Sequence, residues 1–218
     1  MYKRVTKHIK QIGLTFILFI STMPNELYLQ VVAPRVTYLS MQKLLVLMLV
    51  IICSWTGSTR QVSEKLNKEE EKLLSEINTY RKSLGLNKIK LSAKLTKVAQ
   101  VHALDLKNYP PKAPCNMHSW SGNGEGKQCC YTSDHKNPNC MWDKPNELTG
   151  YAEKGYEISA MNTAPNVDWL AQWKKSKGHH QVIINQGIWK QVEWKAIGLA
   201  IRPPYAVVWF GTLEDVNE

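Results

Sequence analysis

Three familiar signatures are missing from the 218-residue sequence. There is no Cys-x-x-Cys pair, which argues against a zinc finger or zinc ribbon. There is no Gly-x-Ser-x-Gly turn, which argues against a serine hydrolase of that kind. The Lys and Arg residues form no clustered stripe of the sort that nucleic-acid-binding proteins present. An apolar content of 44% over this length is nevertheless sufficient for one globular domain with its own core.

The positive charge is concentrated near the N-terminus. The chain has 28 Lys or Arg against 18 Asp or Glu, a formal net charge of +10, and its first 58 residues hold six basic residues but only one acid. The remainder therefore carries a net charge of +5. Lys residues scattered among acids favour solubility and a weak attraction to anionic cell walls or polysaccharides, so we expect no nucleic-acid partner.

Residues 41–58 have the pattern of a secretory signal peptide. A short basic start at Met41 to Lys43 precedes an apolar run at 44–52, and small residues at 56–58 offer a cleavage site. The apolar run is much shorter than the roughly 20 residues that span a bilayer as a helix. We therefore expect a secreted, extracellular protein with no permanent membrane span after cleavage.

A second basic and then apolar unit lies within residues 1–40, and two tandem signals would be redundant. We interpret residues 1–40 as an over-extended start before Met41; the alternative is a hairpin-like membrane leader. Cys53 follows the bulky Ile52, so it is expected to be a spare apolar residue and not a lipidation site. The predicted organisation is a leader at 1–58 and one domain at 59–218.

Four cysteines remain after cleavage, all within 26 residues: Cys115, Cys129, Cys130 and Cys140. An even number of cysteines in an exported domain predicts two disulfides. Adjacent cysteines pair with each other only through a strained ring, so Cys129 and Cys130 each bond a different partner, and which partner stays open. The competing interpretation is a zinc cluster that adds His118 or His135, but the cysteine spacing does not fit it.

Local signals predict two helices at the start of the domain. Asn67 and Glu70 form a capping box for the first, which ends near Gly85. Ser92 caps the second, which the Tyr109-Pro110-Pro111 run stops. His102 falls on the apolar stripe of this second helix, where a buried, hydrogen-bonded core residue is the expected role and a ligand is the alternative.

The later elements are predicted from the same kinds of signal. Residues 111–151 form an irregular loop held by the cysteines, and 155–160 alternate as a strand whose polar face bears Glu157. A helix is expected from about Asn166 to Gly178. Apolar strands at 195–201 and 205–211 flank a Pro-Pro turn and require helices on both faces of their sheet.

These elements, in this order, resemble the CAP superfamily, also called SCP, which includes cysteine-rich secretory proteins, antigen 5 and pathogenesis-related proteins. The similarity is strongest to a bacterial branch and covers nearly the whole domain. It implies an α+β fold, a three-layer α-β-α sandwich. The motifs that carry the resemblance are Ile77 to Arg81 with Gly85-Leu86, Ala99 to Ala103, Cys115 to Ser119, Gly155 to Ile158, Trp173 with Gly178-His179, and Ile197 to Leu199.

The resemblance implies a cleft whose floor holds two histidines and two acids. It places His118, Glu157 and His179 in three of these roles, while Ser176 stands where the second acid is often found. Two histidines without a full ligand set predict a weak, exchangeable zinc site at His118 and His179, because catalytic zinc normally has three protein ligands. His180 is a further candidate ligand; a surface position is the other interpretation.

Physical arguments lead to the same cleft. We expect His179 to lie just after a helix C-terminus, where the helix dipole favours a cation. Ser119 and Ser176 are expected to act there as hydrogen-bonding scaffold. Trp120 and Trp142, on the loop held by the cysteines, are candidates to stack on a sugar or a lipid.

Two functions follow from these residues. The favoured one is a secreted, non-enzymatic binding module whose cleft takes a divalent cation and a small apolar or glycan ligand, such as a cell-wall or lipid fragment. The alternative is a metal-dependent extracellular hydrolase or protease, in which Glu157 is the catalytic candidate. A nucleophile or a complete metal-ligand set would favour the hydrolase, and neither is evident in the sequence.

Overall fold

The computed structural model describes residues 65–215. The predicted signal peptide at 41–58, the alternative start at Met41 and the role expected of Cys53 lie outside these residues and stay predictions. Within the described range, no helix has the length and apolar character needed to cross a bilayer.

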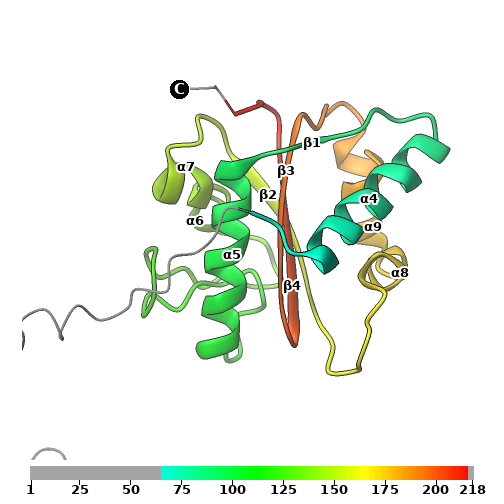
Figure 1. Ribbon diagram of the computed structural model, residues 1–218. Coiled ribbons are helices and arrows are strands. Elements are labelled where there is room, and N and C mark those ends of the chain that lie inside the picture. Colours follow the sequence, from blue (N-terminus) through cyan, green and yellow to red (C-terminus); the bar gives the residue numbers. More distant parts are fainter. Residues whose placement is uncertain (1–64, 216–218) are drawn as a thin grey trace, which may run out of the picture. The chain divides into compact units, whose positions relative to one another are not determined.

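A mixed four-stranded sheet forms the middle layer of the domain (Figure 1). Its strand order is β1-β3-β4-β2. The two central strands pair antiparallel, β2 pairs antiparallel with β4, and the short β1 runs parallel to β3. The strands are β1 (Lys90–Leu91), β2 (Gly155–Met161), β3 (Ala196–Arg202) and β4 (Tyr205–Gly211).

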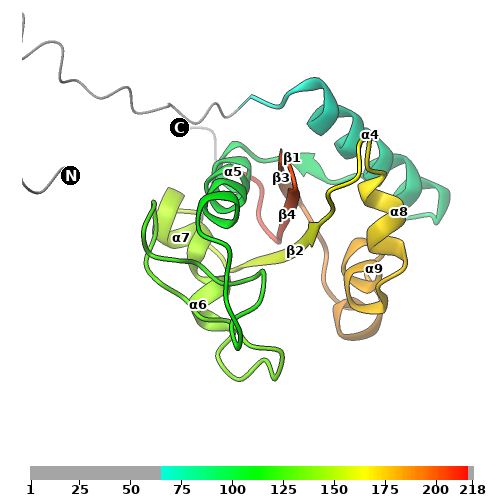
Figure 2. The same cartoon turned by 90° about the horizontal axis from the view of Figure 1, so that it is seen from below.

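Helices cover both faces of the sheet, as Figure 2 shows from below. The first layer holds α5 (Ala93–Asn108), α6 (Asn139–Trp142) and α7 (Lys144–Thr149). The second holds α4 (Lys68–Ser83), α8 (Trp169–Lys174) and α9 (Lys177–Ile183), followed by the 3-10 turn η1 (Gly187–Trp189). Each layer has its own buried apolar cluster against the sheet. This arrangement confirms the predicted α+β fold and its α-β-α sandwich.

The first two helices begin where their capping signals predict. The Asn67 side chain accepts hydrogen bonds from the backbone N–H groups of Glu69 and Glu70, and the Glu70 carboxylate accepts one from the Asn67 N–H. Ser92 accepts from the backbone N–H of Leu95 at the start of α5. The predicted stop after α4 also holds, since Gly85 adopts a positive φ of 75°.

Close packing of α5 on the sheet depends on Gly198 of β3. A Cβ atom at this position would lie 2.1 Å from the backbone carbon of Leu95 and 2.2 Å from the backbone nitrogen of Thr96. Only glycine therefore lets the helix backbone approach this strand so closely. The contact fixes α5, and every side chain on its inner face, relative to the sheet.

Three local predictions need correction. The expected helix from Asn166 to Gly178 is two helices, α8 and α9, separated by an extended Ser176, and Gly178 lies inside α9 instead of ending a helix. The break lets Trp173 and Ile183 both pack into the same core cluster. The connection at 87–91 contains β1, and the irregular loop at 111–151 contains α6 and α7.

Candidate functional site

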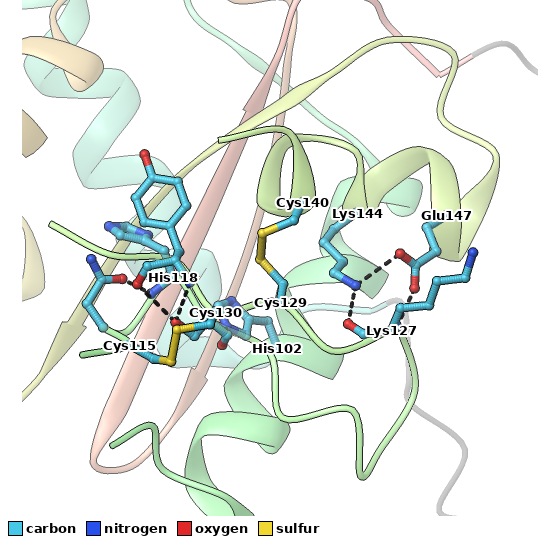
Figure 3. Close-up of a disulfide and its surroundings, with 12 residues drawn as sticks. His102, Cys115, His118, Lys127, Cys129, Cys130, Cys140, Lys144 and Glu147 are labelled. Atoms are coloured by element: carbon cyan, nitrogen blue, oxygen red, sulfur yellow. Dashed lines mark hydrogen bonds and ion pairs between the residues drawn. A yellow bond between two sulfur atoms is a disulfide. The ribbon is translucent and has the colours of Figure 1, made fainter. Parts of the chain in front are cut away.

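Two disulfides organise the loop that leads to the site (Figure 3). Cys115 pairs with Cys130 and Cys129 pairs with Cys140. The prediction of two bridges, with the adjacent cysteines reaching different partners, is confirmed, and the structure supplies the pairing. The first bridge closes the segment that contains His118, and the second ties that segment to α6.

A buried lysine fastens the same loop. Lys144 is only 1% exposed, and its ammonium group donates to the Lys127 carbonyl and to Glu147 Oε2 (Figure 3). It also lies 5.1 Å from the centre of the Trp120 ring, a cation–π contact. The loop is thus held by a satisfied buried charge as well as by covalent bonds.

The disulfide-held loop, β2, α9 and η1 enclose a cleft of about 550 Å³. Much of its wall is aromatic: the ring centres of Trp142 and Tyr156 lie 5.4 Å apart, and those of Tyr156 and Trp189 lie 5.0 Å apart. Met141, Val182 and Ile188 add aliphatic surface, and the polar lining includes His118, Glu157, Ser176 and His179. A cleft of this size and composition fits a small organic ligand.

Glu157 lies at the base of this site and is shared by two histidines. Its Oε1 accepts a hydrogen bond from His118 Nδ1 at 2.9 Å, and its Oε2 lies 2.7 Å from His102 Nδ1. The second contact is a close ion pair in which the N–H is not well aligned with the oxygen. The strand face that bears Glu157 was expected to be polar, but it packs toward His102 of α5, and the Glu157 side chain is fully buried.

His102 is the third member of this group. It is completely buried in α5, its Nε2 donates to the Ser119 carbonyl at 3.0 Å, and its ring stacks on Trp120 with centres 4.3 Å apart. The expectation of a buried, hydrogen-bonded histidine is therefore confirmed. No local signal could identify Glu157 as its partner, because that contact joins α5 to a strand 55 residues further along the chain.

His102 and Glu157 each stabilise the charged form of the other. Burial by itself would raise the pKa of Glu157, but the charges and hydrogen bonds of His102 and His118 outweigh it and lower that pKa to about 2. Burial would likewise lower the pKa of His102, yet the Glu157 carboxylate raises it above the usual value. The resulting arrangement is an imidazolium and a carboxylate paired inside the protein.

His118 and His179 face each other across the polar part of the cleft. Their ring centres lie 6.3 Å apart at an interplanar angle of 75°, and the His118 side chain is 18% exposed. Because His118 Nδ1 is directed at Glu157, its Nε2 is the nitrogen left for the cleft. The structure thus brings together the three residues His118, Glu157 and His179 that the sequence placed in one site.

The predicted position of His179 was wrong in one respect. It lies in the first turn of α9 and not beyond a helix C-terminus, so a helix dipole does not favour a positive charge there. Burial, and next the neighbouring charge of His118, lower its pKa to about 4 despite the attraction of Glu157. His179 is consequently neutral near pH 7, which leaves a ring nitrogen able to accept a hydrogen bond or bind a cation.

The other candidate residues are divided between the cleft and the core. Ser176 lines the cleft. Ser119 is buried away from it, where its hydroxyl accepts from the Tyr131 N–H and donates to the Tyr131 carbonyl. His180 is hydrogen-bonded to the Tyr80 hydroxyl at 2.8 Å. Trp120 is buried under His102 and is not available for stacking on a ligand, whereas Trp142 lines the cleft.

Sequence reasoning missed several parts of the cleft. Tyr131 and His135 line it, joined by a hydrogen bond of 2.8 Å, and Ile188 stands at its edge with 82% of its surface exposed. No spacing signal marked Tyr131 or Ile188, because each reaches the cleft through loop geometry. His135 was considered only as a ligand of a cysteine-zinc cluster, which the two disulfides rule out.

The cleft residues supply only part of a metal-binding site. Among residues 65–215, no three His, Cys, Asp or Glu side chains are grouped so as to hold a metal. His118 Nε2 and His179 offer two nitrogens, while both Glu157 oxygens face histidines. Since structural zinc has four protein ligands and catalytic zinc three, these residues do not form a site for a resident zinc ion.

Comparison with known proteins gives the family. Residues 74–192 match the model of the CAP family, described as the cysteine-rich secretory protein family, and the chain belongs to it. No curated protein matches the chain closely enough to be counted as a relative.

Three solved bacterial structures are similar to the chain. An outer surface protein of Borrelia burgdorferi matches with 23% identity and a TM-score of 0.47 over 68% of this chain and 96% of its own. A cysteine-rich secretory protein of Staphylococcus aureus matches with 17% identity and 0.42, over 64% and 36% respectively. An extracellular SCP-domain protein of Bacillus anthracis matches with 14% identity and 0.45, over 68% and 44%. The match thus spans less than half of the latter two proteins.

Proposed function

We propose that this protein is a secreted, extracellular binding module whose cleft takes a small ligand with an apolar body and a polar group, from a glycan, a cell-wall fragment or a lipid. The observation that carries the proposal is the composition of the cleft, in which aromatic rings line a cavity of about 550 Å³ that also holds the imidazoles of His118 and His179. Export is supported by the two disulfides, which persist in oxidising compartments.

The aromatic wall supplies the apolar part of recognition. Trp142, Tyr156 and Trp189 are all partly buried, and their rings contact one another in sequence. Such rings contribute a large contact area to the face of a sugar or to an acyl chain. The imidazole pair supplies the polar part, because His118 Nε2 and the neutral His179 can accept or donate hydrogen bonds to the ligand's polar group.

The same two imidazoles support weak binding of a divalent cation. Zinc prefers imidazole nitrogen, and here two histidines would hold it while water completes its coordination. We therefore propose a modest, exchangeable zinc affinity and not a committed metalloenzyme. Ser176, in the place where relatives often have a second acid, adds no charge to the site.

A metal-dependent extracellular hydrolase is the second candidate, and one observation favours it. The hydrogen bond from His118 Nδ1 to the Glu157 carboxylate holds the imidazole as a carboxylate holds a general-base histidine, with the other ring nitrogen toward the cleft. The Ser119 hydroxyl is not available as the nucleophile of such a reaction, because the Tyr131 backbone engages it.

Zinc-dependent thermal stabilisation of the secreted domain tests the cation part of the proposal. At a hundredfold excess over its dissociation constant, zinc should add roughly 2.7 kcal/mol to the free energy of unfolding. His118→Ala and His179→Ala should abolish that increment, and His180→Ala, which alters the adjacent residue, should retain it. A full zinc response in both His118→Ala and His179→Ala would contradict the site.

Titration with short glycans and with fatty acids, followed by tryptophan fluorescence, tests the ligand part. Saturable binding should weaken by tenfold or more in Trp189→Ala, while Trp169→Phe, a change in the core away from the cleft, should leave it unchanged. Zinc-dependent turnover of a peptide or cell-wall substrate that disappears in Glu157→Gln, under conditions where circular dichroism shows the variant to be folded, would instead establish the hydrolase.

A further inference from the structure

His102 closes a ring of contacts behind the cleft. One of its nitrogens lies 2.7 Å from Glu157 Oε2, the other bonds the carbonyl of Ser119, and Ser119 directly follows His118, which itself bonds Glu157 Oε1. We propose that His102 is the positioning residue of the cleft: it holds the Glu157 carboxylate and the backbone beside His118, so that His118 keeps its proton on Nδ1 and presents Nε2 to the ligand.

The protonation state of His102 follows from the groups that its two ring nitrogens face. A carbonyl oxygen only accepts hydrogen bonds, so the nitrogen that faces Ser119 carries a proton. A nitrogen lone pair at 2.7 Å from a carboxylate oxygen would be repelled, so the nitrogen that faces Glu157 carries one as well. His102 is therefore an imidazolium whose Nε2–H is hydrogen-bonded to the Ser119 carbonyl and whose Nδ1 forms a close but poorly aligned ion pair with Glu157 Oε2.

The Glu157 carboxylate in turn orients the His118 ring. Each carboxylate oxygen is assigned to a different histidine, and the whole side chain is buried. Because His102 occupies Oε2, the carboxylate has one orientation, with Oε1 in line to accept from His118 Nδ1. Loss of the His102 imidazolium would leave this buried oxygen without its ion-pair partner, and the carboxylate would then be free to rotate away from His118 Nδ1.

The His102 side chain is itself held rigidly. His102 lies on the face of α5 that packs against β3 through Gly198, and its ring is stacked on the buried Trp120 at an interplanar angle of 8°. Precise orientation of a ligand-binding imidazole usually depends on such an outer partner, and loss of that partner typically costs 10- to 100-fold in metal affinity.

Two substitutions separate positioning from packing. In His102→Asn the amide nitrogen takes the place of Nδ1 and can still donate to Glu157. In His102→Gln it takes the place of Nε2 and can donate only to the Ser119 carbonyl. Both variants remove the ring and the charge, and Asn leaves the larger cavity, so a role in packing alone predicts that His102→Asn is impaired at least as much as His102→Gln.

The test is nitrogen NMR of the ¹⁵N-histidine-labelled secreted domain, which reports the tautomer of His118, together with zinc titration. We expect a single Nδ1–H tautomer in the wild type and in His102→Asn, but mixed tautomers in His102→Gln. The zinc affinity should fall at least tenfold in His102→Gln and less than threefold in His102→Asn. His180→Gln is the control and should behave as the wild type.

Equal tautomers and equal affinities in the Asn and Gln variants would overturn the proposal. Should neither variant fold, the wild type still decides it, because a His102 ring that is neutral at pH 7 would exclude the proton arrangement on which positioning depends. The inference rests on the proposed binding role of His118, but the tautomer is read without zinc. A wild type that binds no zinc would therefore contradict the cation site and leave the test of His102 intact.

Discussion

Nδ1 of His102 lies 2.7 Å from Oε2 of Glu157, and both side chains are completely shielded from solvent. The pair joins the helix α5 to the strand β2 directly behind the cleft. Burying two charges is costly, and removal of one partner leaves the other without compensation. The stability of the domain and the geometry of its site therefore depend on the same contact.

Glu157→Gln is expected to destabilise the domain strongly. The substitution leaves the buried imidazolium of His102 without a counter-charge, and breaking a buried ion pair from one side costs about 3–5 kcal/mol. Urea unfolding of the purified domain measures the change. Glu153→Gln, at an exposed position just before the same strand, is the control and should change stability by less than about 0.5 kcal/mol. Equal effects of the two substitutions would show that Glu157 is not paired.

Stability is expected to be highest near pH 6.5. The pKa of Glu157 is lowered to about 2 and that of His179 to about 4, so the stability linked to these groups is lost as the pH falls from about 6.5 toward 2. The pKa of His102 is raised, so its contribution is complete below about 6.5 and is lost as the pH rises through the folded-state pKa. Thermal unfolding between pH 3 and 9 measures the profile, and stability that climbs steadily up to pH 9 would contradict the charged state of His102.

Local signals in the sequence predicted the elements that are stabilised locally. The capping box at Asn67, the Ser92 cap and the apolar strands on each side of Pro203-Pro204 all specify structure within a few residues. These patterns fixed α4, α5, β3 and β4, together with the need for helices on both faces of the sheet.

Features that depend on distant partners were not predicted. β1 is a strand only because it pairs with β3, more than a hundred residues away, and His102 gains its role only when α5 meets β2. Of the site, His118, Glu157 and His179 came from the family resemblance. The burial of Glu157 and the place of His179 inside a helix required the packed structure.

The disulfide pairing predicts the thiol content of two double variants. In the domain at 59–218, which does not contain Cys53, Cys115→Ser with Cys130→Ser removes one complete bridge, so the denatured, unreduced domain should contain no free thiol. Cys115→Ser with Cys129→Ser removes half of each bridge and should expose two thiols, from Cys130 and Cys140. Thiol titration distinguishes them, and the reverse result would establish the other pairing. Loss of one bridge should cost about 2–5 kcal/mol.

Lys144→Met should loosen the disulfide-held loop. The ammonium group is buried and bonds both the Lys127 carbonyl and Glu147, and a hydrogen bond that involves a charged group contributes about 1.5–3 kcal/mol. Unfolding in urea should show a loss of that order. Lys154→Met, which removes an exposed ammonium group hydrogen-bonded to Asn139 and 5.4 Å from the Trp142 ring, is the matched control and should cost less than about 1 kcal/mol. A neutral effect of Lys144→Met would mean that the disulfides alone hold the loop.

The central claim is tested most directly by anomalous X-ray diffraction from crystals of the purified domain that have been soaked with zinc and then with cell-wall fragments. We predict a zinc peak within coordination distance of His118 Nε2 and a His179 ring nitrogen, and ligand density against Trp142 and Trp189 in the same cleft. Zinc bound elsewhere, with the His118–His179 cleft free of both metal and ligand at saturating concentrations, would contradict the account.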